Sequence, residues 1–585
     1  MPTFHSLQDI RLHPFFTALV SAALAGALWT SPAMGKEQTH AMPGGVAKPR
    51  LVLLLMVDGL PNEQLMKNHD LFVANGFRRL MDQGAWYSDA HQAHAFTVTC
   101  IGHTAVLTGA YPYQHGIIGN EWRTRDGKHV YCMSDDAHTF LDGTPVTADD
   151  GTSPKNMRVS TVGDELRYSN NNASRVFGVS GKDRGAMTLA GKTGTAYMFS
   201  SKTGRFTSTT YYMKSHPEWW EKYYAGNPQD AWFHKTWTPL LPAEAYARSI
   251  PDGQTWSTSY KKMPTRLDMT FGASEEKPGP QYYGTLRLGP FGDEAAALFT
   301  AELAKAENLG RNTTGAPDIL AVSFSGHDVV NHNFGPESIE SQDHLIRLDR
   351  IIAGLIGTLD KQVGRDNILI VLTADHGFMN VPEYSASRGF EAGHIDSAEL
   401  RATVNKAAEQ KYGLTKVITQ SMTGGVTLDY AAIDAKNLNR EEVETFVARA
   451  ITDFPGMAFA FTRTQLERGT MPPTRVGLLV TRAWNRQMAI DIAYVQKPFY
   501  FFRSKTTTTP NAASHGTPYA YDTNVPLMFQ GARWIKPGHY TQGAEVVDIA
   551  STLSTILSIR PPSGAEGRAL SEILRTPQTG VAARP

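Results

Sequence analysis

The sequence predicts an α/β fold in which a doubly wound, mostly parallel sheet carries inserted subdomains. Continuous apolar runs at residues 51–57, 319–324 and 368–372 are typical of strands buried on both faces. Residues 338–364 have the apolar spacing of an amphipathic helix. Carboxylate or imidazole side chains follow each run, and ligands of doubly wound sheets bind beyond the carboxyl ends of strands. The first of them, Asp58, is either such a site residue or an aspartate that opens a turn.

The composition narrows the class of protein. The 56 Lys and Arg residues balance the 56 Asp and Glu residues, so no overall field recruits a nucleic acid duplex or an anionic membrane. A hydrophobic content of 41% indicates a globular protein, and the 585 residues suit a large core with insertions. Cys100 and Cys132 are the only cysteines, which excludes a thiolate zinc site. Whether these two pair in an oxidising compartment stays open.

The N-terminal segment has the features of a secretory signal peptide. Arg11 precedes an apolar run from residue 15 to 29, and Ala33-Met34-Gly35 offers the small residues of a cleavage site. The alternative is a membrane anchor, but the run is short for a span and contains Thr, Ser and Gly. We expect a periplasmic or secreted protein with no stable membrane span after cleavage. The expected parts are a signal peptide at 1–35, a flexible N-terminus at 36–49 and one large domain at 50–585.

Two stretches, at about 199–290 and 382–510, interrupt the series of apolar strand runs and amphipathic helices that indicates the core. We interpret both stretches as insertions. Aromatic residues crowd the first, which is either a subdomain packed by aromatic side chains or a lid over a substrate. The second mixes helices and strands. The other predicted elements are helices at 72–84, 293–309, 397–410 and 439–453 and a strand at about 524–529.

A hydroxyl group, Thr99, stands where an apolar run turns into a short helix that Gly109 could cap. A nucleophile at such a helix start faces unpaired N–H groups, which attract phosphate. The alternative is that Thr99 is only the N-cap of the helix. Residues 111–120 are too rich in Gly and Pro for a regular element, so we expect Asn120 on a loop.

Two cations, Lys182 and Arg184, follow a short β-rich run at residues 175–180. One residue apart on an extended chain, they would point the same way and suit a clamp on one tetrahedral anion. The alternative is a solvated turn. Residues 185–193 resemble a phosphate-binding loop but are one residue too long for it, which argues against ATP.

Aspartate and histidine pairs follow the second and third apolar runs. Asp328 and His332 are four residues apart and share a face on a helix, and this pairing suits a divalent metal such as zinc. Asp375 and His376 directly follow the third run. His515, near Gly and Pro, would alone be an ordinary loop residue, but beside these pairs it becomes a candidate ligand.

These residues occur in an order that resembles the alkaline phosphatase superfamily, specifically its threonine-nucleophile bacterial phosphomonoesterases. This branch is related to the nucleotide pyrophosphatases and phosphodiesterases. The resemblance implies that residues 50–585 form an alkaline phosphatase-like catalytic domain. It rests on seven motifs: Asp58, Thr99-x-x-Gly-His, Asn120, Lys182-Asp-Arg184, Asp328-x-x-x-His332, Asp375-His376-Gly377 and His515-Gly516.

The resemblance also implies an exported alkaline phosphatase that hydrolyses small-molecule phosphate monoesters. Thr99 would attack phosphorus and form a phosphothreonine, which water then hydrolyses. Asn120 and Lys182 would hold the non-bridging oxygens, and Arg184 would add positive charge. Two zinc ions are implied, one held by Asp58, Thr99, Asp375 and His376, and the other by Asp328, His332 and His515.

Two other functions compete with this interpretation. One is a phosphodiesterase or nucleotide pyrophosphatase on the same scaffold, and the other is a non-catalytic phosphate- or metal-binding protein. Lys182 and Arg184 favour the monoesterase, because diesterase relatives generally use a pocket for the second ester group at this place. The sulfatase branch is disfavoured because Cys100 lacks the Cys-x-Pro-Ser-Arg context. One departure from the phosphatase relatives is Ile101, where they often have Pro, and we expect it to require only a small backbone adjustment without loss of function.

Overall fold

The computed structural model describes residues 47–257, 266–508 and 510–575. The predicted signal peptide and nearly all of the predicted flexible N-terminus therefore lie outside the described residues. Among the helices of the described segments, none is both long enough and apolar enough to cross a membrane.

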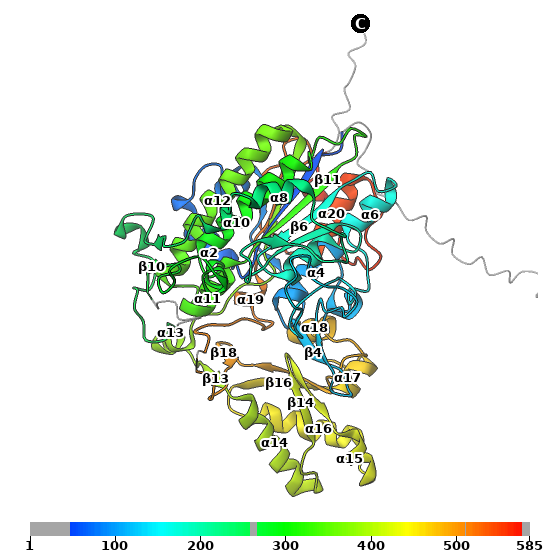
Figure 1. Ribbon diagram of the computed structural model, residues 1–585. Helices are drawn as coiled ribbons and strands as arrows, with labels where there is room; N and C mark the ends of the chain where they lie inside the picture. The colour runs from blue at the N-terminus through cyan, green and yellow to red at the C-terminus, as the bar shows by residue number, and fades with distance from the viewer. Residues whose placement is uncertain (1–46, 258–265, 509, 576–585) are drawn as a thin grey trace, which may run out of the picture. The chain divides into compact units, whose positions relative to one another are not determined.

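The central sheet has nine strands in the order β20-β2-β19-β12-β1-β11-β6-β7-β8. Figure 1 labels β11 and β6, which are neighbours in this sheet. At its centre, β1 (Leu51–Val57) pairs in parallel with β11 (Asp318–Phe324) on one side and with β12 (Ile368–Thr373) on the other. All residues of these three strands are buried, as their continuous apolar sequences predict. The parallel run continues through β6 (Val176–Ser180) and β7 (Thr195–Phe199). The predicted doubly wound, mostly parallel α/β fold is confirmed.

The outer strands are mixed in direction. The predicted strand near residue 527 exists as β19 (Leu527–Gln530), but it runs antiparallel to β12. Beyond it, β2 (Ala85–Tyr87) is antiparallel to β19 and parallel to β20 (Gly538–Tyr540). At the other edge, β8 (Phe206–Thr207) is antiparallel to β7. The parallel centre therefore contains the strand ends that the sequence associates with the site.

Helices cover the sheet in two groups. Figure 1 shows α10 (Pro290–Ala306) and α12 (Ile339–Val363) on one side of β11 and β6, and α6 (Val162–Ser169) and α20 (Asp548–Leu557) on the other. The predicted long helix is α12, which Ser338 caps through its side chain and Gly364 ends. The helix predicted at 72–84 begins only at Phe77, as α3 (Phe77–Gln83), because Asp349 accepts the backbone N–H of Phe77 there.

Aromatic side chains between residues 199 and 290 pack into the main core. Trp220 and Tyr224 of α8 (Glu218–Tyr224) are buried, and the Tyr224 ring stacks on Phe299 of α10. Trp237 is also buried and donates its indole N–H to Asp343 of α12. These contacts support the aromatic-packed interpretation of this stretch over the lid. Its other elements are β9 (Thr236–Trp237), β10 (Met269–Thr270) and α9 (Pro280–Leu286).

Residues 382–510 contain a second sheet in the order β14-β15-β17-β16 (Figure 1). This sheet has its own hydrophobic core, to which Val404, Val443 and Ile492 belong. The predicted helices are present as α14 (Ser397–Tyr412) and α16 (Arg440–Thr452). The strands are β14 (Ile418–Met422), β15 (Gly425–Leu428), β16 (Met457–Thr462) and β17 (Ile492–Gln496).

Candidate active site and metal centre

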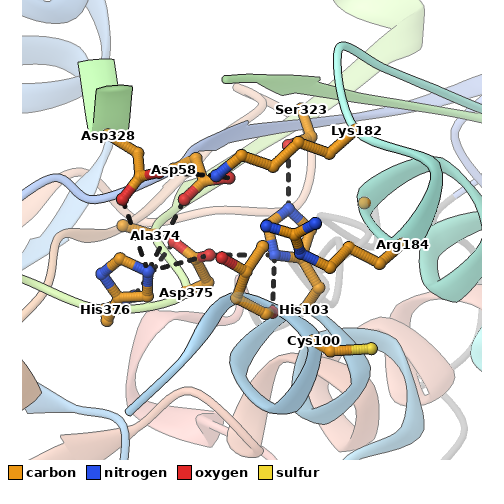
Figure 2. A network of polar contacts seen from close by, with 12 residues as sticks. Asp58, Cys100, His103, Lys182, Arg184, Ser323, Asp328, Ala374, Asp375 and His376 are labelled. Carbon is orange, nitrogen blue, oxygen red and sulfur yellow. Dashed lines mark hydrogen bonds and ion pairs between the residues drawn. The ribbon is translucent and has the colours of Figure 1, made fainter. Parts of the chain in front are cut away.

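Three buried carboxylates meet beyond the carboxyl ends of the central strands. Asp58 directly follows β1, and Asp375 lies two residues after β12. Asp328 lies near the start of α11 (Gly326–Phe334), the helix that follows β11. Because β1 lies between β11 and β12 in parallel register, all three carboxylates reach one edge of the sheet (Figure 2). The backbone N–H of Gly59 donates to Asp375 Oδ1 at 3.0 Å, which links two of these strand ends.

Histidine Nε2 atoms face these carboxylates. His376 Nε2 lies 3.6 Å from Asp58 Oδ1, 3.5 Å from Asp375 Oδ2 and 4.0 Å from Asp328 Oδ1. Asp328 Oδ1 in turn lies 3.4 Å from His332 Nε2. Asp328 Oδ1 also lies 3.5 Å from His515 Nε2. The structure thus brings together six of the seven predicted metal ligands: Asp58, Asp328, His332, Asp375, His376 and His515.

The orientation of the three histidines suits metal binding. In each ring Nδ1 lies close to a backbone carbonyl oxygen: His332 to Ala513 at 2.9 Å, His376 to Gly377 at 2.9 Å, and His515 to Thr97 at 2.7 Å. A carbonyl oxygen only accepts, so these contacts place the proton on Nδ1 and leave the Nε2 lone pair for a ligand. Metal-binding histidines are typically oriented in this way by the hydrogen bond of the other nitrogen.

The electrostatics of the cluster also fit a cation. Oδ1 of Asp58, Oδ1 of Asp328 and Nε2 of His376 are buried and form no hydrogen bond within the described residues. Burial raises the pKa of Asp58 well above its usual range, and the charges of Asp375 and Asp328 raise it further against the opposing effect of Lys182. Buried oxygens without donors and neutral imidazoles are the donor set of a divalent metal, so the residues present fit metal ions.

The pKa values of Asp328 and His515 are also shifted by burial and by neighbouring charges. Burial alone would raise the pKa of Asp328, but Lys182 and the nearby histidines outweigh it and hold this pKa well below its usual range. Burial lowers the pKa of His515 well below its usual range, and His376 and His332 lower it further. Asp328 is therefore ionised and His515 neutral at pH 7, which are the protonation states of metal ligands.

Thr99 is the first residue of α4 (Thr99–Thr108), and Gly109 ends this helix in the left-handed conformation, as expected. The N-cap is Val98, and no side chain caps the helix, so Thr99 does not serve as the N-cap. Its side chain is only 1% exposed. The start of α4 also packs against the cluster of carboxylates and histidines, because a Cβ at Gly102 would overlap the carbonyl oxygen of Asp375. This close approach requires Gly at that position of the motif.

A hairpin carries Asn120 to the start of α4. The strands β4 (Glu121–Arg123) and β5 (His129–Tyr131) form the hairpin, and Asn120 Oδ1 accepts the backbone N–H of Cys100 at 2.8 Å. Cys100 and Cys132 form a disulfide, which answers the question that the sequence leaves open. Cys132 N–H also donates to the carbonyl oxygen of Asn120 at 2.9 Å. The disulfide and the hydrogen bond to Asn120 thus tie the two ends of the hairpin to Cys100, the residue after Thr99.

The segment before this hairpin is more regular than expected. Within residues 111–120, Pro112–His115 form the short helix α5, with Pro at its first position and Gly116 in the left-handed conformation at its end. The expectation of an irregular segment is wrong for these residues, because Pro suits the first turn of a helix and Gly its end. Asn120 itself lies outside regular structure, as expected.

Lys182 has an extended backbone but Arg184 lies within a helix, so the prediction that the two point the same way by alternation along an extended chain is wrong. Lys182 is the N-cap of α7 (Asp183–Ala190), and Arg184 is the second residue of this helix. Both side chains nevertheless approach the cluster from α7 (Figure 2). Lys182 Nζ lies 2.7 Å from Asp58 Oδ2 and 2.6 Å from Asp328 Oδ2, and Arg184 donates to the hydroxyl of Tyr131 at 3.1 Å.

His103 is a site residue to which the sequence argument gives no role. Its Nδ1 atom lies 2.9 Å from the carbonyl oxygen of Thr99 and 3.0 Å from Asp375 Oδ2, and its Nε2 atom lies 2.8 Å from Ser323 Oγ (Figure 2). The ring therefore fixes the carboxylate of Asp375 relative to the helix that carries Thr99. The four-residue spacing of Thr99 and His103, which places both on one helix face, is the signal that could have identified it.

The fold and this cluster define an α/β metalloenzyme, and comparisons with known proteins specify the family. The family model described as type I phosphodiesterase / nucleotide pyrophosphatase matches residues 52–517, and the chain belongs to this family. The predicted resemblance to the alkaline phosphatase superfamily and its relatives among the nucleotide pyrophosphatases is thereby confirmed.

Individual relatives cover nearly the whole chain. Alkaline phosphatase PafA of Elizabethkingia meningoseptica is 32% identical over 94% of this chain and 98% of that protein. A protein named calcium-transporting ATPase from Myroides odoratus is 30% identical over 90% of this chain and 95% of that protein. Alkaline phosphatase PhoV of Synechococcus elongatus is 29% identical over 92% of this chain and 96% of that protein. The crystal structure of PafA matches with a TM-score of 0.82 at 30% identity, over 91% of this chain and 100% of that chain.

Proposed function

We propose that this protein is an exported, zinc-dependent alkaline phosphatase that hydrolyses small-molecule phosphate monoesters. The observation that carries the proposal is the convergence of three buried carboxylates and three histidines with Lys182, beside a threonine at the start of α4. The likeness to PafA and PhoV over nearly the whole chain supports it. The predicted export signal and the Cys100–Cys132 disulfide support an oxidising compartment outside the cytoplasm.

Two zinc ions would be held by the seven predicted ligands. Asp58, Thr99, Asp375 and His376 would hold one ion. Asp328, His332 and His515 would hold the other, and the donor atoms of these three residues lie within 4.8 Å of one another. When bound, the ions would lower the pKa of a hydroxyl and compensate negative charge on the reacting phosphoryl group. His103 would keep Asp375 in place through its contact with Asp375 Oδ2.

The chain's own groups supply the rest of the reaction. Thr99 Oγ would attack phosphorus, the bond from phosphorus to the ester oxygen would break, and the alcohol would leave with a proton from solvent, which gives a phosphothreonine. Water would then attack phosphorus, the bond to Thr99 Oγ would break, and inorganic phosphate would be released. Asn120 Oδ1 is engaged by Cys100 N–H, so its Nδ2 group is the one that would donate to a non-bridging oxygen. Lys182 and Arg184 would add positive charge to these oxygens. Such fixed donors stabilise a transition state because they need no reorganisation.

The two cations favour a monoester over a diester. A monoester presents two negative charges on its non-bridging oxygens, and a diester presents one, so each cation gains more from the monoester. Lys182 Nζ contacts Asp58 and Asp328, two of the proposed metal ligands. Arg184 donates to Tyr131 and forms no ion pair with these carboxylates within the described residues. A substitution of Arg184 therefore tests the preference for monoesters with less disturbance of the proposed metal ligands than a substitution of Lys182.

Replacing either cation should narrow the preference for monoesters. Arg184→Ala and Lys182→Ala are each expected to lower kcat/KM for p-nitrophenyl phosphate roughly 10- to 100-fold, since a charge-assisted contact contributes about 1.5–3 kcal/mol. The loss for bis-p-nitrophenyl phosphate should be smaller. Steady-state kinetics with both substrates measures this, with bound zinc determined for each variant because Lys182 also contacts Asp58 and Asp328.

Lys192→Ala is the matched control, because this lysine lies just beyond the opposite end of α7. It should leave both rates within about twofold, as expected for a surface charge. Equal proportional losses of the two activities in Arg184→Ala would show that this cation does not select the monoester, and the diesterase alternative would then gain support.

A further inference from the structure

A cavity of about 280 Å³ adjoins the proposed reaction centre and shares Lys182 and Arg184 with it. Its wall includes Tyr131 of the hairpin and Phe199 at the end of β7. Two more cations line it, Lys202 in the turn between β7 and β8 and Arg287 at the end of α9, together with Ser200. The proposed phosphatase reaction needs neither Lys202, Arg287 nor Ser200.

The packing of the turn fixes where the two outer cations lie. Gly204, in the turn that carries Lys202, packs on Tyr283 of α9, and a Cβ at this position would overlap the Tyr283 ring. Gly204 also has φ +70°, a backbone conformation that residues other than Gly rarely adopt. Because Arg287 follows α9 directly, this contact holds the turn and the arginine in a fixed relation.

Lys182 of the cavity is paired with Asp58 and Asp328, and Arg184 donates to the Tyr131 hydroxyl, but the other cationic groups have fewer partners than the carboxylates of the cavity. Within the described segments, Lys202, Arg184 and Arg287 form no ion pair, and the Nε atoms of both arginines and Oγ of Ser200 are buried without a hydrogen-bond partner. The three lining carboxylates are engaged nearby. Asp183 accepts from Tyr131 and Gly151, Asp150 accepts from Thr147, and Asp149 lies 3.7 Å from His129 Nε2.

We propose that this cavity binds a second phosphate group, carried by the alcohol part of the substrate. The proposal rests on the phosphatase function, which it deepens by naming a substrate class, phosphate monoesters whose alcohol bears another phosphate. Buried donors without acceptors are costly unless a ligand supplies the acceptors, and guanidinium groups match the oxygens of a phosphate. Arg184, shared by the centre and the cavity, would lie between the two phosphates.

The test compares glucose 1,6-bisphosphate with glucose 6-phosphate. Arg287→Ala is expected to lower kcat/KM for the bisphosphate roughly tenfold or more, because a half-buried guanidinium makes charge-assisted contacts. Lys202→Ala should lower it about two- to fivefold, as expected for an exposed cation. Both variants should change kcat/KM for glucose 6-phosphate by less than about twofold. Lys235→Ala removes an exposed lysine outside the cavity and should change neither value.

Two outcomes would overturn the proposal. Equal losses of kcat/KM on both substrates would show that Arg287 and Lys202 support the fold or the electrostatic potential of the whole site and do not bind a second phosphate. No loss on the bisphosphate would show that the cavity does not hold its second phosphate. Arg287→Lys keeps the charge and should retain part of the bisphosphate activity, which separates lost charge from a disturbed fold.

A binding measurement separates this proposal from the phosphatase function. Calorimetric titration of Thr99→Ala with glucose 1,6-bisphosphate should give a roughly tenfold weaker Kd once Arg287→Ala is added. Titration with inorganic phosphate should give the same Kd with and without Arg287→Ala, since a single phosphate reaches only the centre. A weaker Kd for inorganic phosphate would instead assign Arg287 to free phosphate and overturn the proposal. If the wild-type protein hydrolyses neither sugar phosphate, the phosphatase function fails, and these titrations still test the cavity.

Discussion

Thr99→Ala is expected to lower kcat for phosphate monoesters by more than about 10⁴-fold, as removal of a nucleophile does in other hydrolases. The fold should remain intact. Thr99 makes no side-chain cap bond at the start of α4, so its loss should cost at most about 1 kcal/mol of unfolding free energy. Stopped assays on the purified variant measure the rate, and thermal unfolding followed by circular dichroism measures the stability.

Thr108→Ala provides the control within the same helix. Thr108 is buried at the far end of α4 and donates to the carbonyl oxygen of Thr104 at 2.6 Å. This variant should keep its activity within a few-fold while it loses about as much stability or more. Turnover by Thr99→Ala near the wild-type rate would show that another group is the nucleophile.

Removal of the metal ions is expected to lower turnover by about 1000-fold or more, because bound metal contributes several kcal/mol of transition-state stabilisation. Dialysis against a chelator followed by elemental analysis should show the loss of two ions per chain. Zinc should restore activity better than magnesium, because His332, His376 and His515 present imidazole nitrogens and magnesium prefers oxygen.

Single-ligand variants sharpen this experiment. His332→Ala should reduce the zinc content to about one ion per chain, since it removes a ligand of one proposed site only. His129→Ala is the matched control, because His129 lies 3.0 Å from Glu121 in an exposed group of possible donors and should not change the zinc content. Full activity with no more than one tightly bound ion would contradict the two-metal arrangement.

The central fold could be predicted because its information is local. The residues of β1, β11 and β12 are mostly apolar and all buried, and Ser338 and Gly364 mark both ends of α12. The strand-end rule then placed Asp58 and Asp375 at one edge. These features depend on neighbours in sequence, which a pattern can represent.

The features that could not be predicted depend on contacts across the chain. The late start of α3 depends on Asp349, more than 250 residues away, and the antiparallel direction of β19 depends on its pairing with β12. Lys182 and Arg184 lie at the start of α7, which begins at Asp183, and not on the extended segment that the sequence pattern predicted. The cavity near Arg287 needs α9 and the β7–β8 turn to pack together, which the sequence does not indicate.

The most direct test of the account is to trap the covalent intermediate. The zinc-loaded protein is mixed with excess p-nitrophenyl phosphate at low pH, quenched in acid within milliseconds, digested and analysed by mass spectrometry. The account predicts one added phosphoryl group on the peptide that contains Thr99, located on Thr99 by fragmentation and absent from Thr99→Ala. Hydrolysis of the substrate with a phosphoryl group on any other residue, or continued hydrolysis by Thr99→Ala, would contradict it.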